Sequence, residues 1–159
     1  MEYKIRKAVI EDLEKIQELN TKLCVKEFEE FDDTINPNYP MTQKGKDYFK
    51  YRIENSEESF SYVATDNDKI IGYFIGGVSG VEDYRTPTKI GEGETAFVEK
   101  EYRGKGIGTQ FMKLFEEWAR EKGIKRLRYV ASSRNKEAIK LYKKLGCDEY
   151  DVVLEKVLE

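Results

Sequence analysis

The alternation of hydrophobic and polar positions predicts strands at the start, in the middle and near the end of the chain. Residues 3–6 alternate aromatic or aliphatic with basic side chains, which predicts a short first strand. Residues 59–64 and 69–77 are two β-type runs separated by the turn sequence Asp66-Asn67-Asp68, so they predict an antiparallel hairpin. Further strands are expected at residues 89–98, 126–132 and 150–157.

Apolar residues at helical spacing predict helices between these strands. They are expected from about Asp12 into an acidic run, from Ile107 to a stop at Gly123, and from the capping residue Asn135 to Gly146. A loop over residues 34–45 precedes a weakly amphipathic stretch at residues 46–55. This order of elements predicts an α/β protein with a mixed sheet, antiparallel early and closed by a parallel β-α-β crossover.

Composition removes several kinds of chemistry. The 159 residues include no histidine and only two cysteines, so catalysis by histidine, a zinc site with a histidine ligand and a four-cysteine metal site are all excluded. We expect no metal. The length fits a single domain over residues 1–159, and Cys24 and Cys147 lack the spacing of a disulfide framework. With no signal peptide or long apolar run visible, we expect a cytoplasmic protein.

Charge is unevenly distributed along the chain. Residues 100–145 hold 14 Lys and Arg against 5 Asp and Glu, a net +9, whereas the remainder carries −12 and the total is −3. One basic segment on an acidic body favours a local anionic ligand over nucleic acid. The alternative is that two amphipathic helices simply direct their lysines into solvent.

A glycine-rich stretch lies between the strand ending near Val98 and the next helix. Gly104, Gly106 and Gly108 alternate with larger residues, beside Arg103 and Lys105. Glycines let backbone N–H groups turn towards a ligand, and a helix N-terminus adds partial positive charge, so the loop predicts phosphate binding. A tight turn that needs glycine for packing is the alternative. The spacing matches neither a dinucleotide fingerprint nor a nucleotide P-loop.

Two motifs carry a resemblance to a known family. Arg103-Gly104-Lys105-Gly106-Ile107-Gly108 fits the pattern Arg/Gln-x-x-Gly-x-Gly/Ala, and Asn135-x-x-Ala138-x-x-x-Tyr142-x-x-x-Gly146 fits a second signature further on. Together they resemble the GNAT superfamily of N-acetyltransferases, over nearly the whole chain. Cys147 stands where that superfamily usually has phenylalanine. We interpret Cys147 as a small buried apolar residue rather than an acyl-carrying nucleophile.

The resemblance implies a fold, a cofactor and roles for residues. The fold would be a mixed, mostly antiparallel sheet with helices on both faces, and the reaction a direct acetyl transfer from acetyl-coenzyme A to a primary amine. Backbone groups of Phe97 and Val98 would bind the pantetheine arm where two strands splay apart, and Asn135 would contact the same arm. Tyr142 would protonate the departing thiolate. The residues implied in pyrophosphate binding are Arg103, Gly104, Lys105, Gly106, Ile107, Gly108 and Thr109.

The remaining candidates are carboxylates. With no histidine, the base that deprotonates the amine must be a carboxylate or water, and Glu92 and Glu94 share one face of the strand before the glycine-rich loop. They could equally line a solvated edge. Residues 28–33 interleave acidic residues with Phe28 and Phe31, which suits either a cationic acceptor or a solvated helix end.

Several functional hypotheses stay open at this stage. The partner would be a small-molecule or peptide amine, including cationic amines, with no nucleic acid and no membrane. Both a monomer and a homodimer fit the sequence. A non-catalytic acyl-coenzyme A-binding module of the same fold is the alternative to an enzyme. A nicotinamide-dependent oxidoreductase is disfavoured by the failed glycine spacing.

Overall fold

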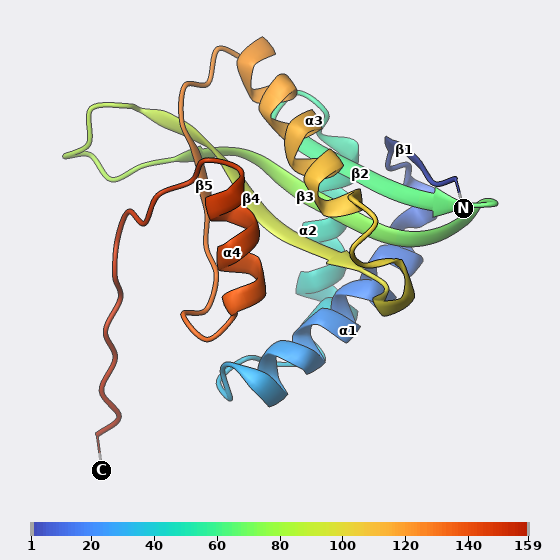
Figure 1. Cartoon of the computed structure of the whole chain (residues 1–159), viewed down its shortest axis with the longest axis horizontal. Helices are drawn as coiled ribbons and strands as arrows, with labels where there is room; N and C mark the ends of the chain where they lie inside the picture. Colours follow the sequence, from blue (N-terminus) through green and yellow to red (C-terminus); the bar gives the residue numbers. More distant parts are fainter. Residues whose placement is uncertain (1, 159) are drawn as a thin grey trace.

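The computed structural model describes residues 2–158, in which a five-stranded sheet lies between two layers of helices (Figure 1). The strands lie side by side in sequence order, and neighbouring strands are antiparallel except β4 and β5, which are parallel. They are β1 (Lys4–Lys7), β2 (Ser59–Asp66), β3 (Lys69–Gly80), β4 (Lys89–Val98) and β5 (Leu127–Tyr129). The expected fold class is thereby confirmed.

Four α-helices connect the strands, and two of them have clear capping residues. The helices are α1 (Leu13–Glu30), α2 (Gln43–Glu54), α3 (Ile107–Glu121) and α4 (Lys136–Lys144), with short 3₁₀ turns at Ile10–Asp12, Tyr39–Met41 and Lys100–Tyr102. The hydroxyl of Thr42 accepts a hydrogen bond from the Gly45 amide and so starts α2 inside the predicted loop. The side chain of Asn135 accepts from the Ala138 amide at 3.1 Å, which confirms the predicted start of α4.

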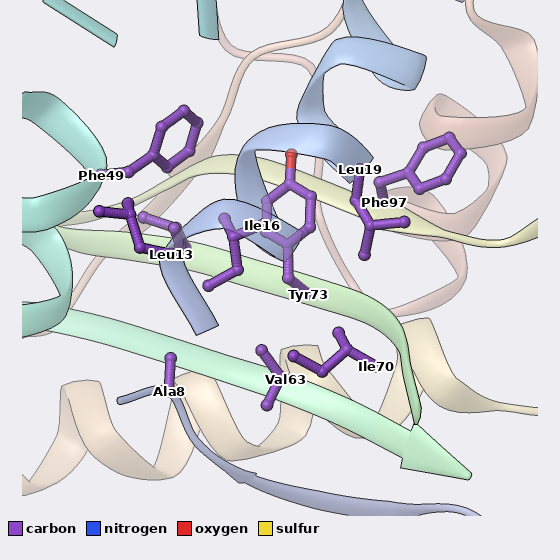
Figure 2. Close-up of a cluster of buried hydrophobic side chains, with 10 residues drawn as sticks. Ala8, Leu13, Ile16, Leu19, Phe49, Val63, Ile70, Tyr73 and Phe97 are labelled. Atoms are coloured by element: carbon purple, nitrogen blue, oxygen red, sulfur yellow. The ribbon is translucent and has the colours of Figure 1, made fainter. Parts of the chain in front are cut away.

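Each face of the sheet has its own apolar core. On one face, side chains of α1 and α2 such as Ile16, Leu19 and Phe49 pack over Val63 and Tyr73 of the hairpin (Figure 2). The opposite face is covered by α3 and is rich in aromatic rings. Its buried members include Phe60, Phe74, Phe111 and Phe115. Successive side chains of β2 and β3 therefore point to opposite faces of the sheet and pack into two different apolar cores.

The parallel pair β4 and β5 separates part of the way along its length. Gly91 to Gly93 pair with Leu127 to Tyr129, after which β4 continues to Val98 paired with β3 but no longer with β5. Glycine is needed at the paired positions, because a Cβ on Gly93 would lie 2.5 Å from the Tyr129 ring and one on Gly91 would lie 2.5 Å from Leu127. Beyond Gly93 the two chain segments diverge and leave a wedge between them.

Two strand predictions need correction. The strand expected at residues 126–132 covers only Leu127–Tyr129 because β4 and β5 diverge there. The strand expected at residues 150–157 is wrong: this segment is extended and exposed, and it belongs to no sheet in the described chain. Alternation of side chains gives a segment the capacity to form a strand, but a partner with free backbone groups is also required.

Candidate active site

The predicted phosphate-binding loop has the conformation that its glycines allow. Gly104 and Gly106 have φ angles of +75° and +86°, a region that other residues rarely adopt. Gly106 is also the N-cap of α3, and no side chain caps that helix end. The first amides of α3 are therefore available to an anion, where the helix dipole favours negative charge.

A basic cavity of about 550 Å³ adjoins this loop. Its cationic lining residues are Lys22, Lys26, Lys100, Arg103, Arg134 and Lys136, and Phe31, Phe97, Asn135, Glu30 and Glu137 complete it. The loop and the start of α4 were expected to contribute positive charge here. The lysines of α1 were not, because helical spacing alone does not show which distant segment a helix face meets.

The side chain of Arg103 is fixed rather than free. Its Nε donates to the carbonyl oxygen of Val98 at 2.9 Å, and its guanidinium carbon lies 5.2 Å from the centre of the Phe97 ring. Arg103 thus ties the end of β4 to the glycine-rich loop. Space beside the loop remains open, since a Cβ on Gly104 would meet nothing within 4 Å. This open, positively charged surface fits the pyrophosphate group of a coenzyme A molecule.

A second cavity, of about 340 Å³, fills the wedge between β4 and β5. We call it the wedge cavity. Residues 93–96 line one side and residues 129–131 the other, and Asn135 is shared with the basic cavity. Helices α1, α2 and α4, the turn before α2 and strand β3 supply the other lining residues. These are Asn20, Leu23, Cys24, Glu27, Tyr39, Tyr48, Phe49, Phe74, Ala138 and Tyr142. The two cavities therefore meet at the N-terminus of α4.

Tyr142 lies in the wedge cavity, stacked on Tyr129. The ring centres are 4.9 Å apart and the planes are nearly parallel. Burial raises the pKa of Tyr142, and the neighbouring Cys147 and Glu27 raise it further. Burial also raises the pKa of Tyr129, whose buried hydroxyl has no hydrogen-bond partner within residues 2–158. Both phenols therefore keep their protons near neutral pH and can donate hydrogen bonds to a ligand.

The structure places the two predicted carboxylates differently. Glu94 lines the wedge cavity, but its carboxylate accepts hydrogen bonds from Arg52 and from the Tyr48 hydroxyl. Glu92 lies outside the described lining of the cavity and is 3.4 Å from the guanidinium of Arg128. Each is therefore held by a cation.

Sequence reasoning missed Glu27, a third carboxylate on α1. Glu27 lines the wedge cavity, and burial, reinforced by Asp32, raises its pKa. The acidic run considered for the acceptor is placed elsewhere: the Asp32 carboxylate accepts from Thr34, and Glu30 lines the basic cavity. Glu27 could have been found from its position one helical turn after Cys24 and two after Asn20, a face directed into the cavity.

The two cysteines lie close to the site as protonated thiols. Both are half-buried, and burial raises the pKa of each thiol. Cys24 Sγ is 3.6 Å from the side-chain oxygen of Asn20. Within residues 2–158 no cluster of metal-ligating side chains is present, and none of the helices there is long and apolar enough to span a membrane.

Comparison with known proteins identifies the family. The model of the Acetyltransferase (GNAT) family matches residues 26–147, and the chain belongs to this family. An uncharacterized N-acetyltransferase of Methanocaldococcus jannaschii is 28% identical over 151 residues, which cover 95% of this chain and 63% of that protein. The chain thus spans less than two thirds of that relative's length.

Solved structures share the fold over almost all of the chain. A protein of Clostridium acetobutylicum, described as a predicted acetyltransferase with acetyl-CoA, has a TM-score of 0.77 at 22% identity, covering 98% of this chain and 96% of that chain. The aminoglycoside N-acetyltransferase AAC(6')-Iy in complex with CoA has a TM-score of 0.76 at 18% identity, covering 99% of this chain and 95% of that chain. At these identities the likeness concerns the fold.

Proposed function

We propose that the protein transfers an acetyl group from acetyl-coenzyme A to a primary amine. The observation that carries the proposal is the junction of two cavities at Asn135: one is basic, and the other is lined by four tyrosines and two carboxylates. An elongated anionic cofactor can place its phosphates in the first and its thioester in the second. The solved relatives that contain CoA or acetyl-CoA support this cofactor.

The cofactor would be held by backbone groups and by cations from two parts of the chain. The amides of Arg103 through Thr109 would face the pyrophosphate. The edge of β4 that faces away from β3 at Phe97 and Val98 would offer backbone hydrogen bonds to the pantetheine arm, beside the Val98 carbonyl oxygen that accepts from Arg103. Lys26 and Arg134 add positive charge from α1 and from the turn before α4. Coenzyme A supplies an acyl group activated as a thioester, whose thiolate is a good leaving group.

The chain's own residues would handle the two protons of the reaction. Glu27 takes a proton from the acceptor ammonium, so that the free amine forms a C–N bond at the thioester carbonyl carbon while the C–S bond breaks. A backbone N–H near Val98 stabilises the negative charge on the carbonyl oxygen. Tyr142 holds a proton at its hydroxyl and would donate it to the departing sulfur. The second proton that the nitrogen loses on becoming an amide would return to the Tyr142 oxygen, and the proton taken up by Glu27 would leave to solvent.

The character of the wedge cavity favours a cationic acceptor. Glu27 provides negative charge, whereas that of Glu94 is paired with Arg52, and the rings of Tyr39 and Tyr48 provide aromatic faces that attract ammonium groups. A small polyamine, an aminoglycoside or an exposed lysine side chain has this chemistry. The structural relative AAC(6')-Iy is named as an aminoglycoside N-acetyltransferase, which agrees with an acceptor of this class.

Release of coenzyme A in a panel of amines tests the proposal. With acetyl-coenzyme A present, thiol release should depend on the amine and be greatest for cationic primary amines. Calorimetry should show binding of coenzyme A itself. Tight binding without release for any amine, including lysine-containing peptides, would instead identify a non-catalytic acyl-coenzyme A-binding module. Absence of binding would reject the cofactor.

A further inference from the structure

Three hydrogen-bonded side chains form a polar triangle beside the wedge cavity. Asn20 of α1 is only 5% exposed, and its side-chain NH₂ group donates to the Tyr73 hydroxyl at 2.6 Å and to Thr95 Oγ1 at 2.9 Å. The hydroxyl oxygens of Tyr73 and Thr95 are 2.8 Å apart, which closes the triangle. Figure 2 shows the Tyr73 hydroxyl directed from β3 towards α1. Of the three, Asn20 and Thr95 line the cavity.

The neighbouring Cys24 fixes the orientation of the Asn20 amide. Cys24 Sγ lies 3.6 Å from the side-chain oxygen of Asn20, and burial raises the pKa of the thiol, so the thiol keeps its proton and donates. A donating thiol needs the amide oxygen as its acceptor, which leaves the NH₂ group for Tyr73 and Thr95. Both N–H donors of the amide are therefore used inside the polar triangle.

The Tyr73 hydroxyl donates to Thr95. Tyr73 is fully buried, and in the part of the chain that the structure describes the only acceptor within hydrogen-bond distance of its hydroxyl is Thr95 Oγ1. A buried hydroxyl that donates to nothing is unfavourable, so the hydrogen of Tyr73 is directed to Thr95. Thr95 Oγ1 then accepts from both Asn20 and Tyr73, which fills the two acceptor positions of a hydroxyl. What Thr95 retains is a single O–H donor.

That donor is left for a ligand in the wedge cavity. Thr95 is half-buried and lines the cavity, and no acceptor of residues 2–158 outside the polar triangle lies within hydrogen-bond distance of its hydroxyl. Along β4, Phe97 lines the basic cavity, whereas residues 93–96 line only the wedge cavity. Thr95 therefore lies on the side of the site away from the cofactor's phosphates, where the acceptor amine would bind.

We propose that Thr95 determines specificity by selecting an acceptor amine that carries an uncharged oxygen atom. This inference rests on the proposed function, because it concerns the amine of that reaction. A hydroxyl that can only donate binds an oxygen, but it offers nothing to a methyl group or to a second ammonium group. An amine that displaces water from Thr95 without replacing its hydrogen bond loses affinity. The preferred acceptors are therefore amino alcohols or amino-acid amides rather than simple diamines.

Pairs of amines that differ in this oxygen test the proposal. Calorimetry with coenzyme A present compares straight-chain amino alcohols of two to five carbons with the alkylamines in which a methyl group replaces the hydroxyl. Glycinamide and isobutylamine form the matching pair for an amide carbonyl. One added hydrogen bond should make the alcohol or the amide bind about two- to tenfold more tightly than its hydrocarbon counterpart. Equal affinities in every pair, or no binding of any of these amines, overturns the proposal.

Three variants show whether Thr95 is the cause of the preference. Thr95→Val removes the hydroxyl and should lose the preference for oxygen, whereas Thr95→Ser should keep it. Tyr73→Phe is the matched control, because it breaks the same Tyr73–Thr95 hydrogen bond but leaves the Thr95 donor directed to the cavity, so it should also keep the preference. A preference that persists in Thr95→Val, or that appears only in Tyr73→Phe, contradicts the assigned direction. If circular dichroism shows that Thr95→Val is unfolded, the amine pairs on the unaltered protein decide.

Thiol release with the same amines separates this inference from the proposed function. Preferential binding of an oxygen-bearing amine, without release of coenzyme A for any amine, would reject acetyl transfer and support the role of Thr95. Release with equal kcat/KM for amines with and without the oxygen would support acetyl transfer and overturn the role of Thr95.

Discussion

At the scale of single residues, the stacked pair of Tyr142 and Tyr129 is the most distinctive feature of the wedge cavity. Each phenol is buried enough for its pKa to be raised, so each remains a proton donor at neutral pH. Their rings are stacked, with the centres 4.9 Å apart and the planes nearly parallel. Tyr142 follows from the sequence motif, while Tyr129 does not, because only the strand register brings it beneath α4.

Replacing Tyr142 tests its role as the acid. Tyr142→Phe keeps the stacked ring and removes only the hydroxyl, so we expect turnover to fall by about tenfold or more, equivalent to roughly 1.4 kcal/mol in the barrier. The affinity for coenzyme A, measured by calorimetry, should stay nearly constant. Tyr84→Phe, at a position 80% exposed in the β3–β4 loop, is the matched control. Equal turnover of Tyr142→Phe and the unaltered protein would remove Tyr142 from the proposed mechanism.

The raised pKa of Glu27 predicts a pH dependence. Glu27 accepts a proton only as a carboxylate, so activity is present above its pKa and is lost as the pH falls through it. Because burial raises that pKa, the acid limb of kcat/KM should lie above the value of about 4.3 for an ordinary glutamate. The Glu27→Gln variant should have much lower kcat/KM, and its remaining activity should no longer fall on the acid side of the pH profile.

The acceptor amine also ionises, but its ionisation affects the pH profile of every variant equally. A difference between variants therefore reports the titration of the replaced side chain. Glu18→Gln, on the exposed side of α1, should leave the profile unchanged. If Glu92→Gln or Glu94→Gln removes the acid limb and Glu27→Gln does not, the base is one of the strand carboxylates instead.

At the scale of elements, the connection from β4 to α3 determines where an anion can bind. Gly106 has a positive φ and is the N-cap of α3, while Gly123 has a positive φ just after the other end of the same helix. Alanine at either position costs about 1–2 kcal/mol in backbone strain. The two glycines thus form a matched pair, of which only one adjoins the proposed cofactor site.

We therefore predict that Gly106→Ala and Gly123→Ala lower stability to a similar extent but differ in cofactor binding. Loss of one charge-assisted hydrogen bond of about 1.5–3 kcal/mol should weaken coenzyme A binding by Gly106→Ala at least tenfold. Gly123→Ala should bind normally. Urea unfolding gives the stabilities and calorimetry gives the affinities. Equal affinities in two folded variants would show that the conformation of the loop is not needed for binding.

Most elements could be predicted from the sequence because their patterns are local. The strand at residues 89–98 and the helix beginning at Ile107 coincide with β4 and α3, and Asn135 caps α4 as expected. The start of α2 was missed because Gly45 reads as a loop residue, although it lies in the first turn behind the cap Thr42. The strand predicted at residues 150–157 is wrong because a pattern does not show whether a partner strand is present.

The site was predictable only where the motif itself forms it. Of the residues that the motifs single out, Arg103 and Asn135 line the basic cavity and Asn135 and Tyr142 line the wedge cavity, whereas Gly104 to Thr109 are outside the described lining of both; their roles stay predictions. Glu27, Lys22 and Lys26 were not identified, because they lie on a helix far away in sequence. The helix pattern shows a polar face, but only the packing of α1 across the sheet shows that this face meets the end of β4.

At the scale of the whole molecule, the uneven charge along the chain becomes a spatial arrangement. The basic cavity combines the loop before α3, the turn before α4 and the lysines of the otherwise acidic first third of the chain. The wedge cavity beside it contains the carboxylate of Glu27, together with Glu94, which is paired with Arg52. An anionic cofactor and a cationic acceptor would therefore approach the reacting centre through regions of opposite charge, which favours correct orientation during association.

This arrangement predicts how salt and single lysines affect cofactor binding. Lys26 lines the basic cavity, whereas Lys15 lies on the same helix, pairs with Glu18 and is outside the cavity's described lining. A partly exposed charge contributes about 0.2–1 kcal/mol, so Lys26→Gln should weaken coenzyme A binding by about 1.4-fold to fivefold, while Lys15→Gln should not. The affinity of the unaltered protein should fall as salt rises, and the fall should be shallower for Lys26→Gln because one fewer cation is screened. Identical salt dependence for both variants and the unaltered protein would mean that the cofactor's phosphates bind outside the basic cavity.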